Sequence, residues 1–262
     1  MKYDISRPKI VMIGAGNVAF QYAIALKSAG YNIFQVYSRT IQSAEKLAKI
    51  TDSKAIISIA EIDQGCDLFI FAVSDRVLSE IIDRIQFSGQ MAIHTSGSVS
   101  IDIFAGKAQH YGVIYPLQTL SKLRILNMQE VPLLIEANSS NNLLNLQSIA
   151  KSMSSNILIS DSFQRRQIHL AAVFASNFTN HMYVIANDLL KKSGFSYQIL
   201  KPIILETALK ALEFDNPNDA QTGPAIRKDS NILEKHLEML SGNKDLKSIY
   251  NLISNHISSS SD

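Results

Sequence analysis

The chain has 262 residues, of which 46% are hydrophobic, and its formal net charge at pH 7 is only +2. This length exceeds that of most single domains and the hydrophobic fraction can fill a substantial core, so we expect two domains. Lys and Arg are scattered along the sequence, which argues against the basic surface that nucleic-acid binding requires. We therefore expect no nucleic-acid partner.

Cys66 is the only cysteine of the chain. A single cysteine rules out an intrachain disulfide and a cluster of thiolate metal ligands, so we expect a buried thiol and no bound metal. The polar N-terminal segment MKYDISRPK lacks the apolar core of a signal peptide, and no apolar run approaches the roughly 20 residues that cross a bilayer. The sequence predicts a cytoplasmic protein without a membrane partner.

A glycine-rich turn separates the first predicted strand from the first predicted helix. The strand runs from Lys9 to Ile13, and Gly14-Ala15-Gly16-Asn17-Val18-Ala19 leads into the helix. Gly14 permits a sharp turn, Gly16 lets the backbone approach a pyrophosphate, and the small Ala19 lets the helix pack closely on the strand. The helix N-terminus also offers N–H groups and a positive dipole end to phosphates. The pattern predicts a dinucleotide site at Gly14, Ala15, Gly16, Asn17 and Val18, although small residues at such a turn also serve packing alone.

The residues that follow the second predicted strand indicate which dinucleotide binds. This strand, Ile33 to Tyr37, is followed by Ser38, Arg39 and Thr40. A domain that prefers NAD usually has an acidic residue here for the ribose 2′-hydroxyl, whereas an Arg accommodates a 2′-phosphate. Two hydroxyl groups beside a guanidinium can bind that phosphate, so we predict NADP as the cofactor and NAD as the less favoured one. In the alternative interpretation, Ser38 caps the next helix and Arg39 is solvated.

Strand and helix patterns alternate through the first 160 residues, which predicts an α/β fold with a Rossmann-type dinucleotide-binding sheet. Leu68 to Val73 is an apolar run, as in central strands buried on both faces. After the two strands above, strands are predicted at residues 55–57, 68–73, 91–93, 112–115, 131–136 and 156–159, with helices ending near Ile50 and Gly65 and at 77–85 and 141–153.

Polar residues follow two of the central strands. Open α/β sheets bind ligands at the carboxyl ends of their strands. We therefore expect Ala72, Val73 and Ser74 to lie along the bound cofactor, and His94 and Ser96 to lie near the nicotinamide and the substrate. As an alternative, both segments are ordinary turns that cap a following helix, and the two interpretations are compatible.

From Ser162 onward the sequence shows only helical periodicity, so we place a domain boundary near Ser160. Residues 1–160 are predicted to be the NAD(P)-binding domain and residues 161–262 an all-α domain that binds the substrate. Helices are predicted from Phe163 to Ser193, from Ser196 onward with Pro202 as a kink or a restart, and at 229–240 and 245–257.

The first of these helices carries polar residues within an apolar stretch. His169, Val173, Asn177 and His181 are spaced by four residues and share one face. Burying a polar group without a partner costs about 1–3 kcal/mol, so other helices or a bound substrate should satisfy them. Hydride transfer to a carbonyl or an imine requires a proton donor near pH 7, and His169, His181 and His94 are candidates. We predict His169 as the acid and Asn177 as the anchor of the substrate.

These motifs together resemble those of a known family. Besides the glycine turn and residues 38–40, they include HTSGS at 94–98, YPLQT at 115–119, HLAAVFASNFTNHM at 169–182 and TGPAIRKD at 222–229. The chain is similar over nearly its whole length to bacterial Rossmann-like proteins that carry a C-terminal domain of unknown function 2520 and are described as NADP oxidoreductases. A more distant resemblance to pyrroline-5-carboxylate reductase, β-hydroxyacid dehydrogenases and ketopantoate reductase implies NADP-linked reduction of a small keto acid, hydroxy acid or imine. It also implies a homodimer formed through the helical domain.

The sequence departs from these distant relatives at two places. The β-hydroxyacid enzymes have a catalytic Lys four residues before an Asn, and here Val173 stands at that distance from Asn177. The Thr- and Gly-rich signature of pyrroline-5-carboxylate reductase is not evident. TGPAIRKD stands in a comparable region, where Arg227 could bind a carboxylate or Asp229 could simply cap a helix. A non-catalytic NADP(H)-binding sensor or scaffold is therefore the alternative function, and a deazaflavin-dependent reductase is a further option.

Overall fold

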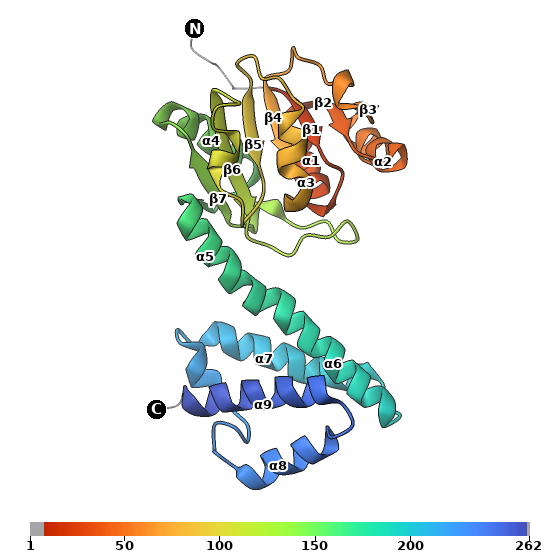
Figure 1. Cartoon of the computed structure of the whole chain (residues 1–262), viewed down its shortest axis with the longest axis vertical. Coiled ribbons are helices and arrows are strands. Elements are labelled where there is room, and N and C mark those ends of the chain that lie inside the picture. The colour runs from red at the N-terminus through yellow and green to blue at the C-terminus, as the bar shows by residue number, and fades with distance from the viewer. Residues whose placement is uncertain (1–7, 261–262) are drawn as a thin grey trace. The chain divides into compact units, whose positions relative to one another are not determined.

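The computed structural model describes residues 8–260, and the chain divides into two compact units between His181 and Met182 (Figure 1). Residues 1–7, most of the segment that argues against a signal peptide, lie outside the described residues. No helix in the described part of the chain is long and apolar enough to cross a membrane. The first unit contains the sheet, and the second is helical.

The first unit is built on a sheet of eight strands in the order β3-β2-β1-β4-β5-β6-β7-β8. Neighbouring strands are parallel except for β6 and β7, which are antiparallel. The strand order reverses at β1, because β2 and β3 are added on one side of it and β4 and the later strands on the other. Open α/β sheets bind ligands at such a switch point. The strands are β1 Lys9–Ile13, β2 Asn32–Tyr37, β3 Lys54–Ile56, β4 Leu68–Phe71, β5 Met91–His94, β6 His110–Pro116, β7 Leu133–Ala137 and β8 Ile157–Ile159.

Helices cover both faces of this sheet, and β1 shows how the sequence achieves it. Alternate residues of a strand point to opposite faces. Ile10 and Met12 pack in one buried cluster with residues of helices α1 (Asn17–Ser28), α2 (Ile41–Thr51) and α4 (Ser140–Met153). Val11 and Ile13 pack in another with α3 (Asp75–Asp83) and the 3₁₀ turn Ile101–Phe104. The α/β fold class predicted from the sequence is confirmed.

One predicted element of this unit is wrong. The helix expected to end near Gly65 is only a single 3₁₀ turn, Ile59–Glu61, closed by a capping box between Ser58 and Glu61. Asp63 then accepts a hydrogen bond from the N–H of Gly65 at 2.8 Å. These local side-chain bonds compete with helix formation, so the chain turns instead.

The helix expected over residues 163–193 has an interruption. It consists of α5 (Ser162–Ala172), a π-helical segment (Val173–Phe178) and α6 (Thr179–Lys192). The wider turn changes which side chains share a face, and such segments occur frequently at functional sites. Gly194, with φ +79°, follows the end of α6, as expected.

The second unit is helical. Ser196 caps a 3₁₀ turn, Tyr197–Leu200, and Pro202 lies in the first turn of α7 (Lys201–Glu213), so this proline starts a helix rather than kinking one. The unit also contains α8 (Ser230–Met239) and α9 (Lys244–Ser259). As predicted, no strand follows β8 among residues 160–260. The two compact units meet after His181, however, and not near the predicted boundary at Ser160, so α5 belongs to the unit that contains the sheet.

Candidate functional site

A cavity of about 740 Å³ lies in the first unit, where the ends of two strands meet α5 and the π-helical segment. Its volume is within the range of small-molecule sites. Three residues of the predicted site, Val18, His169 and Asn177, line it together. The full lining is Val18, Thr95, Tyr115, Pro116, Leu117, Gln118, Thr119, Leu120, Ile168, His169, Ala171, Ala172, Val173, Ala175, Ser176 and Asn177.

Position 14 requires glycine, because the backbone that follows β4 passes close to it. Its φ is +116°, and a Cβ atom there would lie 2.2 Å from the carbonyl oxygen of Ala72. Its N–H donates a hydrogen bond to Tyr37 at 2.8 Å. The turn is therefore held against the ends of β2 and β4, where only glycine fits.

Gly16 has the opposite surroundings, because nothing lies within 4 Å of the place where its Cβ would be. It is the N-cap residue of α1, and no side chain caps this helix N-terminus. The first N–H groups of an α-helix have no partner within the helix and attract anions. Open space beside uncapped donors fits the pyrophosphate of a dinucleotide.

The Ser38-Arg39-Thr40 segment directly follows β2. Ser38 is half-buried, whereas Arg39 and Thr40 are exposed. Among the described residues no acidic side chain pairs with Arg39. Thr40, not Ser38, is the N-cap residue of α2, and it makes no side-chain cap bond. The interpretation of Ser38 as a helix cap is therefore wrong. The Thr40 hydroxyl donates a hydrogen bond to that of Ser43 at 2.9 Å, so its oxygen is turned toward α2.

The residues after β4 extend along the same edge of the sheet. Ala72 is buried against Gly14, Val73 is half-buried and Ser74 is exposed. Ser74 is the N-cap residue of α3, yet its side chain makes no cap bond. The Asp75 carboxylate accepts a hydrogen bond from the hydroxyl of Ser98. This contact connects the loops that follow β4 and β5.

We expected His94 near the nicotinamide and the substrate, but it is not among the residues that line the cavity. Its side chain is fully buried and stacks on Phe104, with ring centroids 5.8 Å apart. Its Nδ1 accepts a hydrogen bond from the N–H of Ser96 at 3.1 Å. Burial, and secondarily the charge of Arg165, lowers the pKa of His94 to about 3. The ring is therefore neutral at pH 7 and cannot serve as an acid there.

Ser96 and its neighbours shape the loop after β5. The Ser96 hydroxyl accepts hydrogen bonds from the N–H groups of Ser98 and Val99, both at 3.1 Å. The alternative interpretation of this segment as a turn therefore holds. Neither His94 nor Ser96 is among the residues that line the cavity, whereas Thr95, which lies between them, is.

His169 contacts a residue that sequence reasoning missed. Its Nδ1 lies 2.9 Å from the hydroxyl oxygen of Tyr115 at the end of β6, and the two rings meet edge to face. Gly97 packs against both, since a Cβ there would lie 2.7 Å from the His169 ring and 2.9 Å from that of Tyr115. Tyr115 belongs to the motif YPLQT and Gly97 to the motif HTSGS, but the sequence does not show that the two motifs meet at His169.

The π-helical segment determines which residues of this helix reach the cavity. Ser176 and Asn177 both line it, although the four-residue spacing alone would select only Asn177. His181 is exposed and does not line the cavity. In the second unit, Arg227 is exposed and Asp229 caps α8 through the N–H of Ile232 at 3.3 Å.

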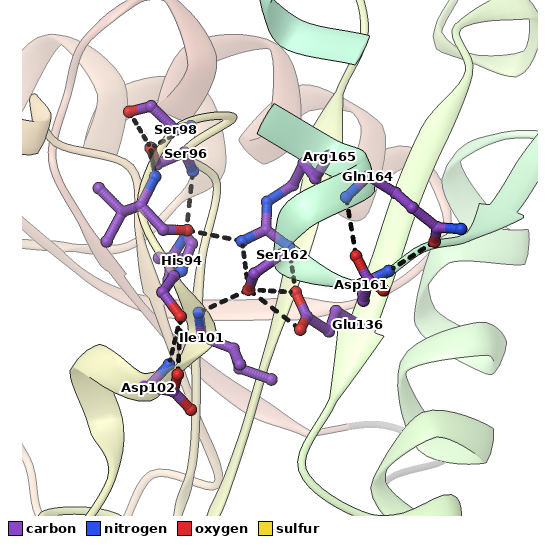
Figure 2. Close-up of polar contacts among 12 residues, drawn as sticks. His94, Ser96, Ser98, Ile101, Asp102, Glu136, Asp161, Ser162, Gln164 and Arg165 are labelled. Carbon is purple, nitrogen blue, oxygen red and sulfur yellow. Dashed lines mark hydrogen bonds and ion pairs between the residues drawn. The ribbon is translucent and has the colours of Figure 1, made fainter. Parts of the chain in front are cut away.

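A buried polar cluster attaches the start of α5 to the sheet (Figure 2). The wholly buried guanidinium of Arg165 forms an ion pair with Glu136 on β7 and donates to the carbonyl of Val99. The Ser162 hydroxyl donates to Glu136 at 2.8 Å and accepts from the N–H of Ile101 at 3.0 Å. Sequence reasoning missed this cluster as well, because its members lie on three separate elements.

Two family models match the chain. A Rossmann-like domain matches residues 2–118, and a domain of unknown function, DUF2520, matches residues 131–257. The crystal structure of a Bacteroides fragilis protein provisionally named as an NADP oxidoreductase is 40% identical, with a TM-score of 0.90. The alignment covers 98% of this chain and all of that one.

More distant solved structures share the fold. A protein from Thermotoga maritima has 21% identity and a TM-score of 0.79, covering 95% of this chain and 97% of its own. The pyrroline carboxylate reductase of Plasmodium falciparum with NADP bound has 15% identity and a TM-score of 0.60, and the alignment covers 97% of this chain and 99% of that one. A reductive aminase from Aspergillus terreus in complex with NADPH has 14% identity and a TM-score of 0.65, and the alignment covers 97% of this chain and 92% of that one. No curated protein matches the sequence significantly.

Proposed function

Because this chain belongs to the family of Rossmann-like proteins with a C-terminal DUF2520 domain, we propose that it is an NADP-dependent oxidoreductase that reduces or oxidises a small keto acid, hydroxy acid or imine. The observation that carries the proposal is the cavity of the first unit. It combines Val18 of the glycine turn with His169 and Asn177. In this proposal Val18 contacts the bound dinucleotide and His169 donates a proton, and both residues line the same cavity.

The proposed cofactor site follows the carboxyl edge of the sheet. Gly14, Ala15, Gly16, Asn17 and Val18 would surround the pyrophosphate and lead toward the nicotinamide, with the uncapped α1 N-terminus as donor. Ala72, Val73 and Ser74 would line the cofactor from the neighbouring strand. His94 is not part of this proposal, because its buried ring supports the loop instead.

The choice of NADP rests on the end of β2. Ser38, Arg39 and Thr40 stand there without an acidic residue, and Arg39 is exposed. A guanidinium can donate two parallel hydrogen bonds to a phosphate, and an acidic residue would repel it. We infer that these three residues bind the 2′-phosphate, so that NAD binds more weakly.

NADPH supplies a hydride to the carbon of a carbonyl or imine, and the protein must supply the accompanying proton. In our proposal His169 donates it to the oxygen or nitrogen of the substrate. Asn177 donates and accepts hydrogen bonds that orient the substrate. The apolar lining, which includes Ala171, Ala172 and Val173, limits the access of water to the reacting atoms.

The helical part of the chain supports a homodimer. Among the described residues of the second unit only Ala225 and Ser254 are buried, which is too little for an independent core. On α7, Leu205, Leu209 and Leu212 are 61%, 46% and 83% exposed and share one face at spacings of four and three. We infer that a second copy covers this face. A cytoplasmic location is part of the same proposal.

The second candidate is an NADP(H)-binding sensor or scaffold without turnover. Val173 favours it, because it occupies the place where β-hydroxyacid dehydrogenases have a catalytic Lys. In this alternative the cofactor would bind at the same residues, and its occupancy would govern assembly or a partner. His169 and Asn177 would then act only in binding.

A panel assay separates the two candidates. NADPH oxidation is followed with keto acids and cyclic imines, and the NADPH Kd is measured in parallel by fluorescence. We expect one compound to be reduced, and His169→Ala to lower kcat about a hundredfold or more. Asn177→Ala should mainly raise KM. His181→Ala, on an exposed side chain of the same helix outside the cavity, is the matched control. Tight NADPH binding without turnover would favour the sensor, and absence of NADPH binding would contradict both.

A further inference from the structure

The contact between Tyr115 and His169 joins two elements that are 54 residues apart in the chain. Tyr115 is the second-last residue of β6, and His169 lies on α5. Both side chains line the cavity, and the Tyr115 hydroxyl oxygen lies 2.9 Å from Nδ1 of His169. Among the described residues, Nε2 of His169 makes no hydrogen bond. The hydroxyl therefore occupies one ring nitrogen and leaves the other to a bound molecule.

The hydroxyl of Tyr115 can satisfy Nδ1 in both charge states of the imidazole. Burial raises the pKa of Tyr115, an effect that the positive charge of Arg165 partly opposes. The phenol therefore keeps its proton around pH 7 and can donate to an unprotonated Nδ1. When the ring is an imidazolium, the same oxygen accepts from Nδ1–H. An imidazolium that gives up its proton from Nε2 becomes the neutral tautomer with hydrogen on Nδ1, and the Tyr115 oxygen can go on accepting a hydrogen bond from that hydrogen.

Packing around the pair restricts the ring further. The absence of a side chain at Gly97 admits the His169 ring to within contact of the loop after β5. The rings of His169 and Tyr115 are 5.6 Å apart with an interplanar angle of 83°. Arg165, one helical turn before His169, is tied to Glu136 on β7, so the backbone of α5 is held as well. The remaining freedom of His169 lies in its side-chain torsions, which the Tyr115 hydroxyl limits.

We propose that Tyr115 is a positioning residue, whose hydroxyl holds Nδ1 of His169 and thereby assigns Nε2 as the nitrogen that exchanges a proton with the substrate. This inference rests on the proposed role of His169 as the acid. Tyr115 acts through His169, so its contribution to the reaction depends on the presence of the imidazole. Two measurements test that dependence, one of which needs no substrate.

The first measurement is histidine ¹⁵N NMR of the full chain, with the His169 signals assigned from their loss in His169→Gln. In the wild type we expect the neutral ring of His169 to be mainly the tautomer with hydrogen on Nδ1, because a ring that exchanges its proton at Nε2 keeps the other hydrogen on Nδ1. Tyr115→Phe keeps the aromatic ring but removes the hydroxyl, and should give a mixture of tautomers. Tyr111→Phe is the matched control, since Tyr111 lies on the same strand and no described residue is hydrogen-bonded to its hydroxyl. An unchanged tautomer in Tyr115→Phe would overturn the inference, whatever the activity.

The second measurement is a double-mutant cycle with the substrate found in the panel. We expect Tyr115→Phe to lower kcat about tenfold and to alter the pH profile, with KM and the NADPH Kd within about twofold. In a His169→Ala background, Tyr115→Phe should have no further effect. An equal loss in both backgrounds would show that Tyr115 acts independently and would refute the inference. If no compound is turned over, the proposed function fails, and the tautomer measurement still decides the role of Tyr115.

Discussion

The guanidinium of Arg165 on α5 forms a buried ion pair with the carboxylate of Glu136 on β7. The side chain of Arg165 is 0% exposed and that of Glu136 only 14%. The hydroxyl of Ser162 and the carbonyl of Val99 provide further hydrogen bonds. Because α5 also carries His169, this pair fixes a part of the proposed site from outside the cavity.

Removing one partner of this pair should be costly. Arg165→Ala leaves the Glu136 carboxylate desolvated without its cation, and we expect a loss of about 3 kcal/mol in the free energy of unfolding. Arg166→Ala, at the exposed neighbouring position, should change it by less than about 0.5 kcal/mol. Urea denaturation of both variants measures the difference. Equal losses would mean that the buried pair contributes nothing specific.

The buried ring of His94 should make stability depend on pH. Its pKa is lowered to about 3, first by burial and then by Arg165. Between its ordinary pKa of about 6.5 and that value the unfolded chain binds a proton that the folded chain does not, so stability falls as the pH falls. From pH 7 to pH 5 we expect this group to account for a loss of about 2 kcal/mol.

The corresponding measurement is urea denaturation at both pH values for the wild type and His94→Gln. The variant should lose most of this component, since its amide does not titrate. A pH dependence that is the same in the variant would assign the effect to other groups. His256→Gln, which replaces an exposed histidine, is the control.

The two glycines of the cofactor turn should respond differently to alanine. Gly14→Ala combines a φ of +116° with a Cβ that would lie 2.2 Å from the Ala72 oxygen, and should destabilise the protein by about 3 kcal/mol. Gly16→Ala meets open space, so stability should change by less than about 0.5 kcal/mol. Its Cβ would nonetheless enter the place of the pyrophosphate and raise the NADPH Kd at least about tenfold, or about 1.4 kcal/mol. Thermal unfolding and fluorescence titration give the two quantities, and unchanged NADPH binding in Gly16→Ala would place the pyrophosphate elsewhere.

Arg39 should determine the preference for NADPH. Arg39→Ala removes a charged donor from the proposed 2′-phosphate site, which we expect to raise the Kd for NADPH about tenfold or more. The Kd for NADH, which lacks the phosphate, should change by less than about twofold. Arg84→Ala, another exposed arginine, serves as the control. A parallel loss of both cofactors would contradict the assignment of Arg39.

Charges on the apolar face of α7 should disrupt the proposed dimer. Introducing Leu205→Glu and Leu212→Glu together places two carboxylates on side chains that are 61% and 83% exposed in the single chain. We expect sedimentation to show a shift from dimer toward monomer, because burying unpaired charges opposes association. Leu123→Glu, at a side chain that is 98% exposed in the first unit, should leave the assembly unchanged. A monomeric wild type would refute the proposal.

Local patterns of the sequence predicted much of the fold. The strand from Lys9 to Ile13 has the predicted bounds, and the glycine turn, the end of β2 and the helix stop at Gly194 lie where expected. These features depend on neighbouring residues, such as an apolar alternation or a backbone conformation open to glycine. The prediction of a helix near Gly65 failed because hydrogen bonds to the side chains of Ser58 and Asp63 compete with the backbone hydrogen bonds of a helix.

Local sequence patterns predicted only a part of the candidate site. The sequence by itself determined the glycine turn, the polar residues after β2 and the placement of His169 and Asn177 on one helix. The tertiary structure decided that His94 is buried against Phe104, that Ser176 reaches the cavity and that Tyr115 meets His169 beside Gly97. Such contacts join elements that are far apart in the chain. Their distances follow from how strands and helices pack, a property of three-dimensional geometry that no local spacing of residues encodes.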